Sequence, residues 1–120
     1  MTSEVVWVDL PVTDLKRAMT FYSAITASKF HHFSEQVAAL DHKSGHASIC
    51  LFQSTDESPS KEGALIYINL SQSIENAIKQ VEINGGKIIR PIHEIQPYGK
   101  RAIILDSEGN RIALHEPLDN

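Results

Sequence analysis

Two ionisable side chains stand on predicted strands where acid–base chemistry is feasible. Because side chains alternate between the faces of a strand, Asp9 shares a face with Trp7, and His115 shares a face with Ala113. A carboxylate near an imidazole orients the ring, so this pair suits a general base or the binding of a polar ligand group. The alternative interpretation is that Asp9 ends its strand at a turn and that His115 lies at the rim of the fold.

The chain has six histidines, which raises the question of a metal site. His31 and His32 are adjacent and therefore face opposite sides of a strand, whereas His42 and His46 flank a turn and could meet across a hairpin. None shows the paired spacing of a structural zinc site, and Cys50 is the only cysteine. We interpret the histidines as scattered surface residues, with adventitious binding of nickel or zinc as the alternative.

Cys50 and Tyr98 are further candidates for a ligand pocket. No basic residue adjoins Cys50 in the sequence to activate its thiol, so we interpret it as a lining residue rather than as a nucleophile. The segment RPIHEIQPYGK, residues 90–100, contains two prolines and a glycine. It predicts either a loop over a pocket mouth, with Tyr98 stacking on a ligand, or an ordinary long hairpin loop.

Length and composition narrow the class of protein. The 120 residues, with 42% hydrophobic and 22% charged residues, are typical of one soluble globular domain. A net charge of −4 argues against a nucleic-acid partner, and a single cysteine excludes an internal disulfide and fits a reducing compartment. The N-terminal MTSEVVWVDL lacks the features of a signal peptide, and no apolar run approaches the length of a membrane span. We therefore predict a cytoplasmic protein with no membrane or nucleic-acid partner.

The elements that position these residues occur twice along the chain. In the first half, residues 5–10 predict a strand, Thr13 or Asp14 caps a helix, and Ser44-Gly45 supplies a turn. The buried face of that helix is made of residues three and four positions apart: Leu15, Ala18, Met19, Tyr22 and Ile25. Three strands follow the helix, near residues 29–33, 37–41 and 47–53.

After a polar linker, about residues 54–62, the same order restarts. Residues 64–70 predict a strand, Ser73 caps a helix, and Asn84-Gly85-Gly86 ends it. The buried face of the second helix is Ile74, Ala77, Ile78 and Val81. Three strands follow, near residues 87–90, 101–105 and 111–116, with a tight turn at Glu108-Gly109-Asn110.

The two halves match at a constant offset of 59 residues along their helices, which places Trp7 on Ile66. We interpret the chain as a single domain, residues 1–120, built from two βαβββ modules, about 4–53 and 63–117. The predicted fold class is α+β, with a curved eight-stranded mixed sheet and the helices on its outer face. Its concave side is a predicted cup for a small molecule.

The segments LPVTDLKRAMTFY, QVEINGGKII and LDSEGNRIALHEP resemble the vicinal oxygen chelate superfamily of glyoxalases, bleomycin-resistance proteins and extradiol dioxygenases, most closely a glyoxalase-like branch. The resemblance covers residues 5–117 and is specific for the superfamily rather than for one reaction. It implies a homodimer and, in glyoxalase-like members, one divalent metal held by His, Gln or Glu from the first and last strands of each module. Carried over, those positions fall on Trp7, Cys50, Ile66 and Ala113, which provide no such ligand set. We therefore expect no cofactor, with a divalent metal at an atypical site as the alternative.

These observations favour a protein that binds a small organic ligand in an apolar cup without metal, as bleomycin-resistance members do by sequestration. The alternatives are a glyoxalase-like lyase or related enzyme that uses Asp9 and His115 or an atypical metal site, and a non-catalytic regulatory module. Tyr67 and Asn69 alternate with the isoleucines of their strand and are expected on the opposite face from the cup. The predicted pocket residues are Trp7, Asp9, Cys50, Phe52, Ile66, Ile68, Tyr98, Ala113 and His115.

Overall fold

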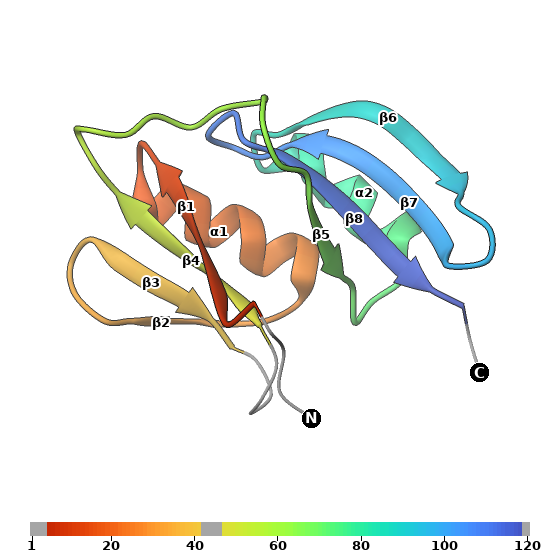
Figure 1. Cartoon of the computed structure of the whole chain (residues 1–120), viewed down its shortest axis with the longest axis horizontal. Coiled ribbons are helices and arrows are strands. Elements are labelled where there is room, and N and C mark those ends of the chain that lie inside the picture. Colours follow the sequence, from red (N-terminus) through yellow and green to blue (C-terminus); the bar gives the residue numbers. More distant parts are fainter. Residues whose placement is uncertain (1–4, 42–46, 119–120) are drawn as a thin grey trace.

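The computed structural model describes residues 5–41 and 47–118, so that His42, His46 and the Ser44-Gly45 turn lie outside the described residues. These residues form two successive βαβββ units (Figure 1). The first unit contains β1 (Trp7–Val12), α1 (Leu15–Thr26), β2 (Phe30–His32), β3 (Val37–Leu40) and β4 (Ser48–Gln53). The second contains β5 (Ile66–Asn69), α2 (Ile74–Ile83), β6 (Lys87–Glu94), β7 (Gly99–Leu105) and β8 (Arg111–Pro117). The predicted α+β fold and its two modules are confirmed.

Each unit has its own four-stranded sheet, and the strand order is the same in both. The order is β1-β4-β3-β2 in the first sheet, called sheet A, and β5-β8-β7-β6 in the second, called sheet B. In each sheet the first and last strands of the unit are parallel, and the other neighbours are antiparallel. The predicted eight-stranded sheet thus consists of two halves, and within the described chain no ladder of hydrogen bonds joins them.

One helix covers one side of each sheet. Helix α1 packs on sheet A, α2 packs on sheet B, and the two helices contact each other. Figure 1 shows both helices behind the strands. Side chains from both units form one hydrophobic core, whose largest fully buried members include Phe21, Tyr22, Ile25, Leu51, Ile74 and Ile104. The other side of each sheet, which faces away from the helices, is called its open face below.

The helices begin at the polar residues that the sequence predicts. Of the two candidates for α1, Asp14 is the cap, because its side chain accepts a hydrogen bond from the backbone N–H of Arg17. Ser73 caps α2 in the same way. At the other end of α2, the backbone N–H of Gly86 donates to the Val81 carbonyl at 2.8 Å, and Gly85 has a φ of 94°. Glycine reaches this left-handed conformation without steric cost, which explains why the helix ends there.

The last strand of each unit also reaches back to the first residue of that unit's own helix. Gln53 Oε1 accepts a hydrogen bond from the backbone N–H of Leu15 at 2.8 Å. Glu116 Oε1 accepts one from the backbone N–H of Ile74, also at 2.8 Å. Both contacts satisfy an N–H group that has no partner within the helix. The duplication therefore extends from the strand order to the capping contacts.

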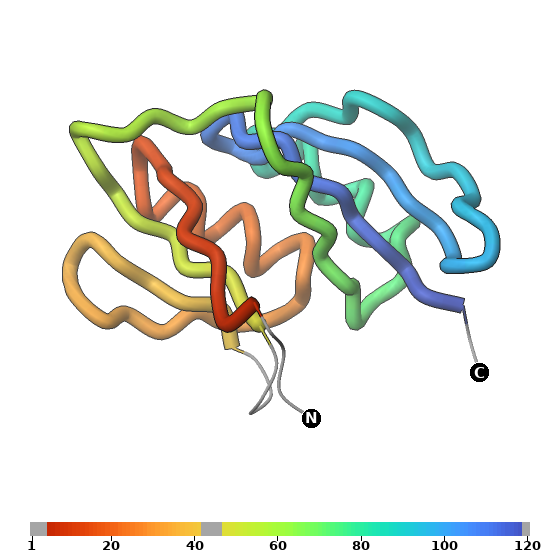
Figure 2. The backbone as a smooth tube through the Cα atoms, viewed as in Figure 1, coloured from red at the N-terminus to blue at the C-terminus, as the bar shows by residue number. Residues whose placement is uncertain are grey.

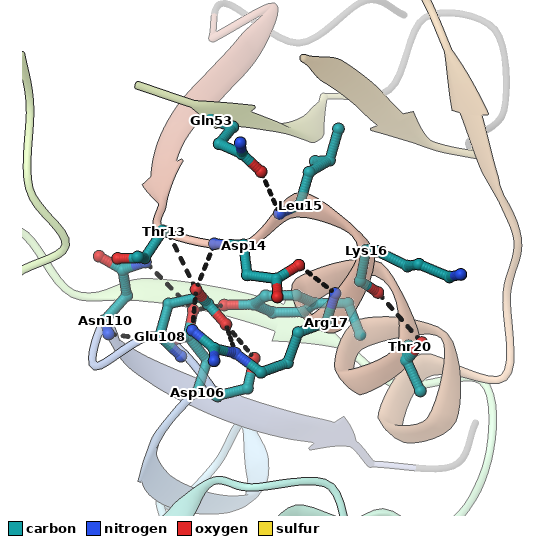
Figure 3. A network of polar contacts seen from close by, with 12 residues as sticks. Thr13, Asp14, Leu15, Lys16, Arg17, Thr20, Gln53, Asp106, Glu108 and Asn110 are labelled. Carbon is teal, nitrogen blue, oxygen red and sulfur yellow. Dashed lines mark hydrogen bonds and ion pairs between the residues drawn. The ribbon is translucent and has the colours of Figure 1, made fainter. Parts of the chain in front are cut away.

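The turn between β7 and β8 clamps the second unit onto the first (Figure 3). Glu108 Oε1 accepts hydrogen bonds from the backbone N–H groups of Thr13 and Asp14, both at 2.9 Å. Arg17 Nε lies 2.7 Å from Glu108 Oε2, and Arg17 Nη2 lies 2.8 Å from Oε1. Burial alone would raise the pKa of the Glu108 carboxyl, but these hydrogen bonds and that from Ser107 hold it below its usual value.

A second contact of the same turn is buried. The hydroxyl of Tyr22 in α1 donates to Asp106 Oδ2 at 2.5 Å, and Asp106 also accepts from the backbone N–H groups of Glu108 and Asn110. Burial raises the pKa of Tyr22 well above its usual value, and the neighbouring Asp106 charge raises it further. The D-S-E-G-N turn is therefore explained by helix capping and by contact between the units.

The segment that joins the units, residues 54–65, runs from the end of β4 to the start of β5 (Figure 2). It contains no helix or strand. Ser60 attaches it to the β7–β8 turn, since its backbone N–H donates to Asn110 Oδ1 at 3.0 Å and its carbonyl accepts from the N–H of Arg111. The connection is thus held at its middle by the same turn that caps α1.

The predicted loop over residues 90–100 is corrected by the structure. Strand β6 continues to Glu94 and β7 begins at Gly99, so the connection is only residues 95–98. Pro91 does not break β6, because this strand is at the edge of sheet B and its ladder to β7 shifts register on both sides of Arg90. Such shifts let an edge strand accommodate a residue that has no N–H to donate.

Candidate ligand-binding site

The open face of sheet A carries most of the predicted pocket residues of the first unit. In β1 the side chains of Leu10 and Val12 are buried in the core, whereas Trp7 is 60% exposed. Cross-strand partners share a face, and Asp9 pairs with Cys50. Phe52 lies two residues beyond Cys50 and therefore points to the same side.

A depression of about 350 Å³ lies on this face. Its volume falls within the range of small-molecule sites. Among the described residues of its wall, the only ionisable side chains are Asp9 and Cys50, and the others are Val6, Trp7, Phe33, Val37, Ala39 and Ser48. Phe52 is on the same face but outside this wall.

Cys50 has the environment of an unactivated thiol. Burial raises its pKa, and the negative charge of the neighbouring Asp9 raises it further. Both effects favour the protonated thiol, which is a poor nucleophile and a poor metal ligand.

The structure corrects the orientation of β5. Ile66 and Ile68 pair with Ile112 and Leu114, on the side that packs against the helices. They line a different cavity, of about 320 Å³, that lies between the units and is also lined by Val8 and Ile49. Tyr67 and Asn69 are on the open face, although both also reach the wall of this cavity.

The reason for this correction is the length of one connection. Two residues separate the buried Val12 from the start of α1, but three separate the buried Leu70 from the start of α2. The offset of 59 that aligns the helices therefore misaligns the strands by one residue. Because strand side chains alternate, a shift of one residue exchanges the two faces.

The open face of sheet B is polar, unlike that of sheet A. One row of side chains crosses all four strands: Asn69 pairs with His115, His115 with Arg101, and Arg101 with His93. A second row lies next to it, with Tyr67 opposite Ala113. Of these residues, only His115 and Ala113 were predicted from the sequence to lie in the site.

Arg101 joins the two rows. Its Nε donates to His93 Nε2 at 2.9 Å, and its Nη1 donates to the hydroxyl oxygen of Tyr67 at 2.6 Å. His93 Nδ1 lies 2.8 Å from the carbonyl oxygen of Pro91, which only accepts hydrogen bonds. These partners assign a neutral His93 ring with its hydrogen on Nδ1.

His115 is held on both of its ring nitrogens. Nε2 lies 2.9 Å from the carbonyl oxygen of Tyr98, so Nε2 carries a hydrogen. Nδ1 lies 2.5 Å from the side-chain oxygen Oδ1 of Asn69. The ring also packs against Tyr67 edge to face, with 6.4 Å between the ring centroids. Tyr98 thus contributes its backbone to the site, while its side chain is 68% exposed.

The two acid–base candidates are not brought together in one chain. Asp9 belongs to β1 of sheet A, and His115 belongs to β8 of sheet B. The ring nitrogens of His115 contact Asn69 and Tyr98, and no hydrogen bond or ion pair joins Asp9 to His115 in the described part of the chain.

The residues at the superfamily's metal positions do not fit a divalent ion. With Leu65 in place of Ile66, as the one-residue shift requires, those positions present an indole, a protonated thiol, an isobutyl group and a methyl group, at Trp7, Cys50, Leu65 and Ala113. Divalent ions prefer imidazole, carboxylate or thiolate ligands. Elsewhere in residues 5–41 and 47–118, no three His, Cys, Asp or Glu side chains cluster as ligands would.

Arg101 is one of the residues of this face that were not predicted from the sequence. A signal for it exists in the β7–β8 hairpin, where Leu105 pairs with Arg111 and Ile103 with Ala113. Counting outward from the turn in steps of two places Arg101 directly opposite His115. The hairpin register would therefore have found it.

Several solved structures share this fold. A glyoxalase/bleomycin resistance protein from Albidiferax ferrireducens T118 is 18% identical with a TM-score of 0.78, and the match covers 97% of this chain and all (100%) of that one. The fosfomycin resistance protein FosX from Listeria monocytogenes is 17% identical with a TM-score of 0.70, over 100% of this chain and 95% of that one. A glyoxalase-related enzyme from Fulvimarina pelagi is 14% identical with a TM-score of 0.75, over 95% and 88%.

One of the two sequence comparisons found a match. No curated protein matches the chain significantly. Among the described helices, none is long and apolar enough to cross a bilayer. The family model matches residues 4–114, nearly the whole chain. The chain therefore belongs to the Glyoxalase/Bleomycin resistance protein/Dioxygenase superfamily.

Proposed function

We propose that the protein binds a small organic molecule against the open face of sheet A, without the divalent metal of glyoxalase-like enzymes. The observation that carries this proposal is the apolar depression of about 350 Å³ with Trp7 in its wall. An apolar concavity with few polar groups suits a ligand that is largely hydrophobic. The side chains at the superfamily's metal positions support binding without metal, because they provide no ligand set.

The proposal includes a homodimer. Trp7 and Phe33 are 60% and 73% exposed, and Val6 beside them is 62% exposed. Contiguous apolar surface of this kind marks a binding or association site in a soluble protein. A second copy seated over the patch would bury it and close the depression. Sedimentation equilibrium should give twice the chain mass of 13.3 kDa, and a monomer at micromolar concentration would contradict the dimer.

The second candidate function is a glyoxalase-like lyase or related enzyme that uses Asp9 and His115. It is favoured by the ordered His115 ring, which is held by Asn69 and Tyr98. It requires the two sheets to face each other across a dimer, because Asp9 and His115 lie on different sheets of one chain. Metal-free binding ranks first since it needs only groups that one open face already presents.

The test uses Trp7, which is the only tryptophan in the chain. Small aromatic and thiol-containing compounds are titrated with and without a chelator, and Trp7 fluorescence and the melting temperature are recorded. A ligand of the folded state raises the melting temperature by mass action. We expect a saturable change in both signals that the chelator does not affect.

Two variants make this test specific. Trp7→Ala should weaken binding at least roughly tenfold, since it removes a large apolar wall, and its binding is read from the melting temperature because the variant has no tryptophan. Ile83→Ala, at an exposed residue of α2, should leave affinity unchanged. One equivalent of tightly held metal, with a chelator-sensitive melting temperature, would overturn the proposal in favour of the enzyme.

A further inference from the structure

We propose that the open face of sheet B binds the oxyanion of a small organic acid, a carboxylate or a phosphate, and that Arg101 is the cation that holds it. The inference rests on the proposed function only in taking the ligand to be a small organic molecule. Three observations carry it: the separation of charge across sheet B, the fixed position of the Arg101 side chain, and its lack of a carboxylate partner.

Charge is divided between the two sides of sheet B, although the whole chain carries a net charge of −4. In the four strands of this sheet the only carboxylates are Glu94 and Glu116. Both pair with Lys100, whose ammonium contacts Glu75 of α2 at 3.1 Å, so these carboxylates lie on the helix-facing side. The open face carries only basic ionisable side chains besides Tyr67: Lys87, Arg90, His93, Arg101, Arg111 and His115.

The Arg101 side chain is held in place before any ligand arrives. His93 and Tyr67 take one hydrogen bond each from its Nε and Nη1. The His93 ring is itself fixed by the Pro91 carbonyl. Side-chain ordering therefore costs little when a ligand binds, which is the advantage of a preorganised site.

Neither partner of Arg101 neutralises its charge. His93 accepts the hydrogen bond as a neutral ring, and Tyr67 accepts it through a hydroxyl. In residues 5–41 and 47–118, no carboxylate forms an ion pair with Arg101. By contrast, Arg17 on α1 has a carboxylate partner in Glu108. Among the described residues, Arg101 is thus a half-buried cation with no carboxylate to compensate its charge.

The free hydrogens of Arg101 match an oxyanion. Both hydrogens of Nη2 and one of Nη1 have no partner in the described chain, and Arg presents such hydrogens as a planar fork. Carboxylate and phosphate oxygens accept this fork in a bidentate manner, and the resulting charge-assisted bonds are about twice as strong as neutral ones. His115 lies beside the fork, but both of its ring nitrogens already have hydrogen-bond partners. We therefore assign it the role of positioning neighbouring side chains rather than of contacting the ligand.

The experiment compares three compounds of similar shape: benzoate, phenyl phosphate and the neutral benzamide. Melting temperature and Trp7 fluorescence are followed at constant ionic strength, adjusted with sodium chloride. In the same titration, NMR records the Nε–H resonance of Arg101. We expect benzoate or phenyl phosphate to shift the melting temperature and this resonance saturably, and benzamide to shift neither. The tighter of the two anions identifies carboxylate or phosphate as the preferred group.

Variants test whether Arg101 is responsible. Arg101→Gln should weaken the anion at least about tenfold, and Arg101→Lys, which keeps the charge without the fork, should weaken it less. Lys79→Gln removes one positive charge from the exposed surface of α2 and should leave affinity unchanged within about twofold. If Arg101→Gln does not fold, the Arg101 Nε–H resonance of the parent protein still shows whether the anion binds at Arg101.

The outcomes separate this inference from the proposed function. Equal binding of benzamide and benzoate, or an Arg101 resonance that ignores both anions, overturns the anion site and leaves the apolar site of sheet A standing. Arg101-dependent anion binding with no change in Trp7 fluorescence for any compound supports the anion site and contradicts the role of the sheet A depression.

Discussion

Glu108 and Arg17 form an ion pair between the two modules, with Arg17 Nε 2.7 Å from Glu108 Oε2, although 91 residues separate them in the chain. The side chain of Glu108 has no solvent exposure, whereas that of Arg17 is half exposed. The same carboxylate accepts from two backbone N–H groups at the start of α1. Glu108, in the D-S-E-G-N turn, thus joins the two modules and also caps helix α1.

Removing this clamp should destabilise the whole chain. Glu108→Ala leaves N–H groups at the start of α1 and the Arg17 guanidinium without their partner, and we expect a loss of about 2 kcal/mol in the free energy of unfolding. Urea denaturation measures it. Glu82→Ala, at an exposed residue of α2, is the matched control and should change stability by less than about 0.5 kcal/mol. Equal stability of the two variants would show that the clamp contributes nothing.

The same carboxylate should make stability depend on acid pH. The pKa of Glu108 in the folded chain is depressed, whereas a glutamate in the unfolded chain has a pKa of about 4.3. Its contribution is therefore complete above that pH and is lost as the pH falls through the folded pKa, because the unfolded state then binds more protons. Urea denaturation below about pH 4.3 should show a steeper loss for the parent than for Glu108→Gln. Parallel curves would contradict this role.

The Cys50 thiol of the folded chain should react slowly with a disulfide reagent. Burial and the charge of Asp9 raise its pKa, so less thiolate is present at pH 8. We expect an aromatic disulfide reagent to react roughly threefold or more slowly with the folded chain than with the urea-unfolded chain. Asp9→Asn should accelerate the folded reaction, while Asp56→Asn, in the exposed connection, should not. An unchanged rate in Asp9→Asn would show that the charge of Asp9 does not act on the thiol.

The two equivalent helix contacts should contribute independently. Gln53→Ala and Glu116→Ala each remove one hydrogen bond at the first residue of a helix, at a cost of about 1 kcal/mol. Because the two sites are in different modules, the double variant should lose about the sum of the two costs. Thermal or urea denaturation of the three variants checks this. A double-variant loss far from the sum would show that the modules are coupled through these contacts.

The sequence by itself determines the elements and their order. Apolar residues at three- and four-residue spacing identify both helices, and Asp14, Ser73 and Gly85 mark their ends. These signals act between neighbours along the chain, so the residues alone reveal them. The internal repeat then predicts that each module repeats the other, which the strand orders of sheets A and B confirm.

Only the tertiary structure decided which side chains share a face in the second module. One extra residue before α2 turns Tyr67 and Asn69 outward and Ile66 and Ile68 inward, and helix periodicity carries no information about that connection. The position of Arg101 beside His93 and Tyr67 depends on pairing across all four strands of sheet B. Such contacts join residues far apart in sequence, and packing of the whole sheet against α2 sets their register.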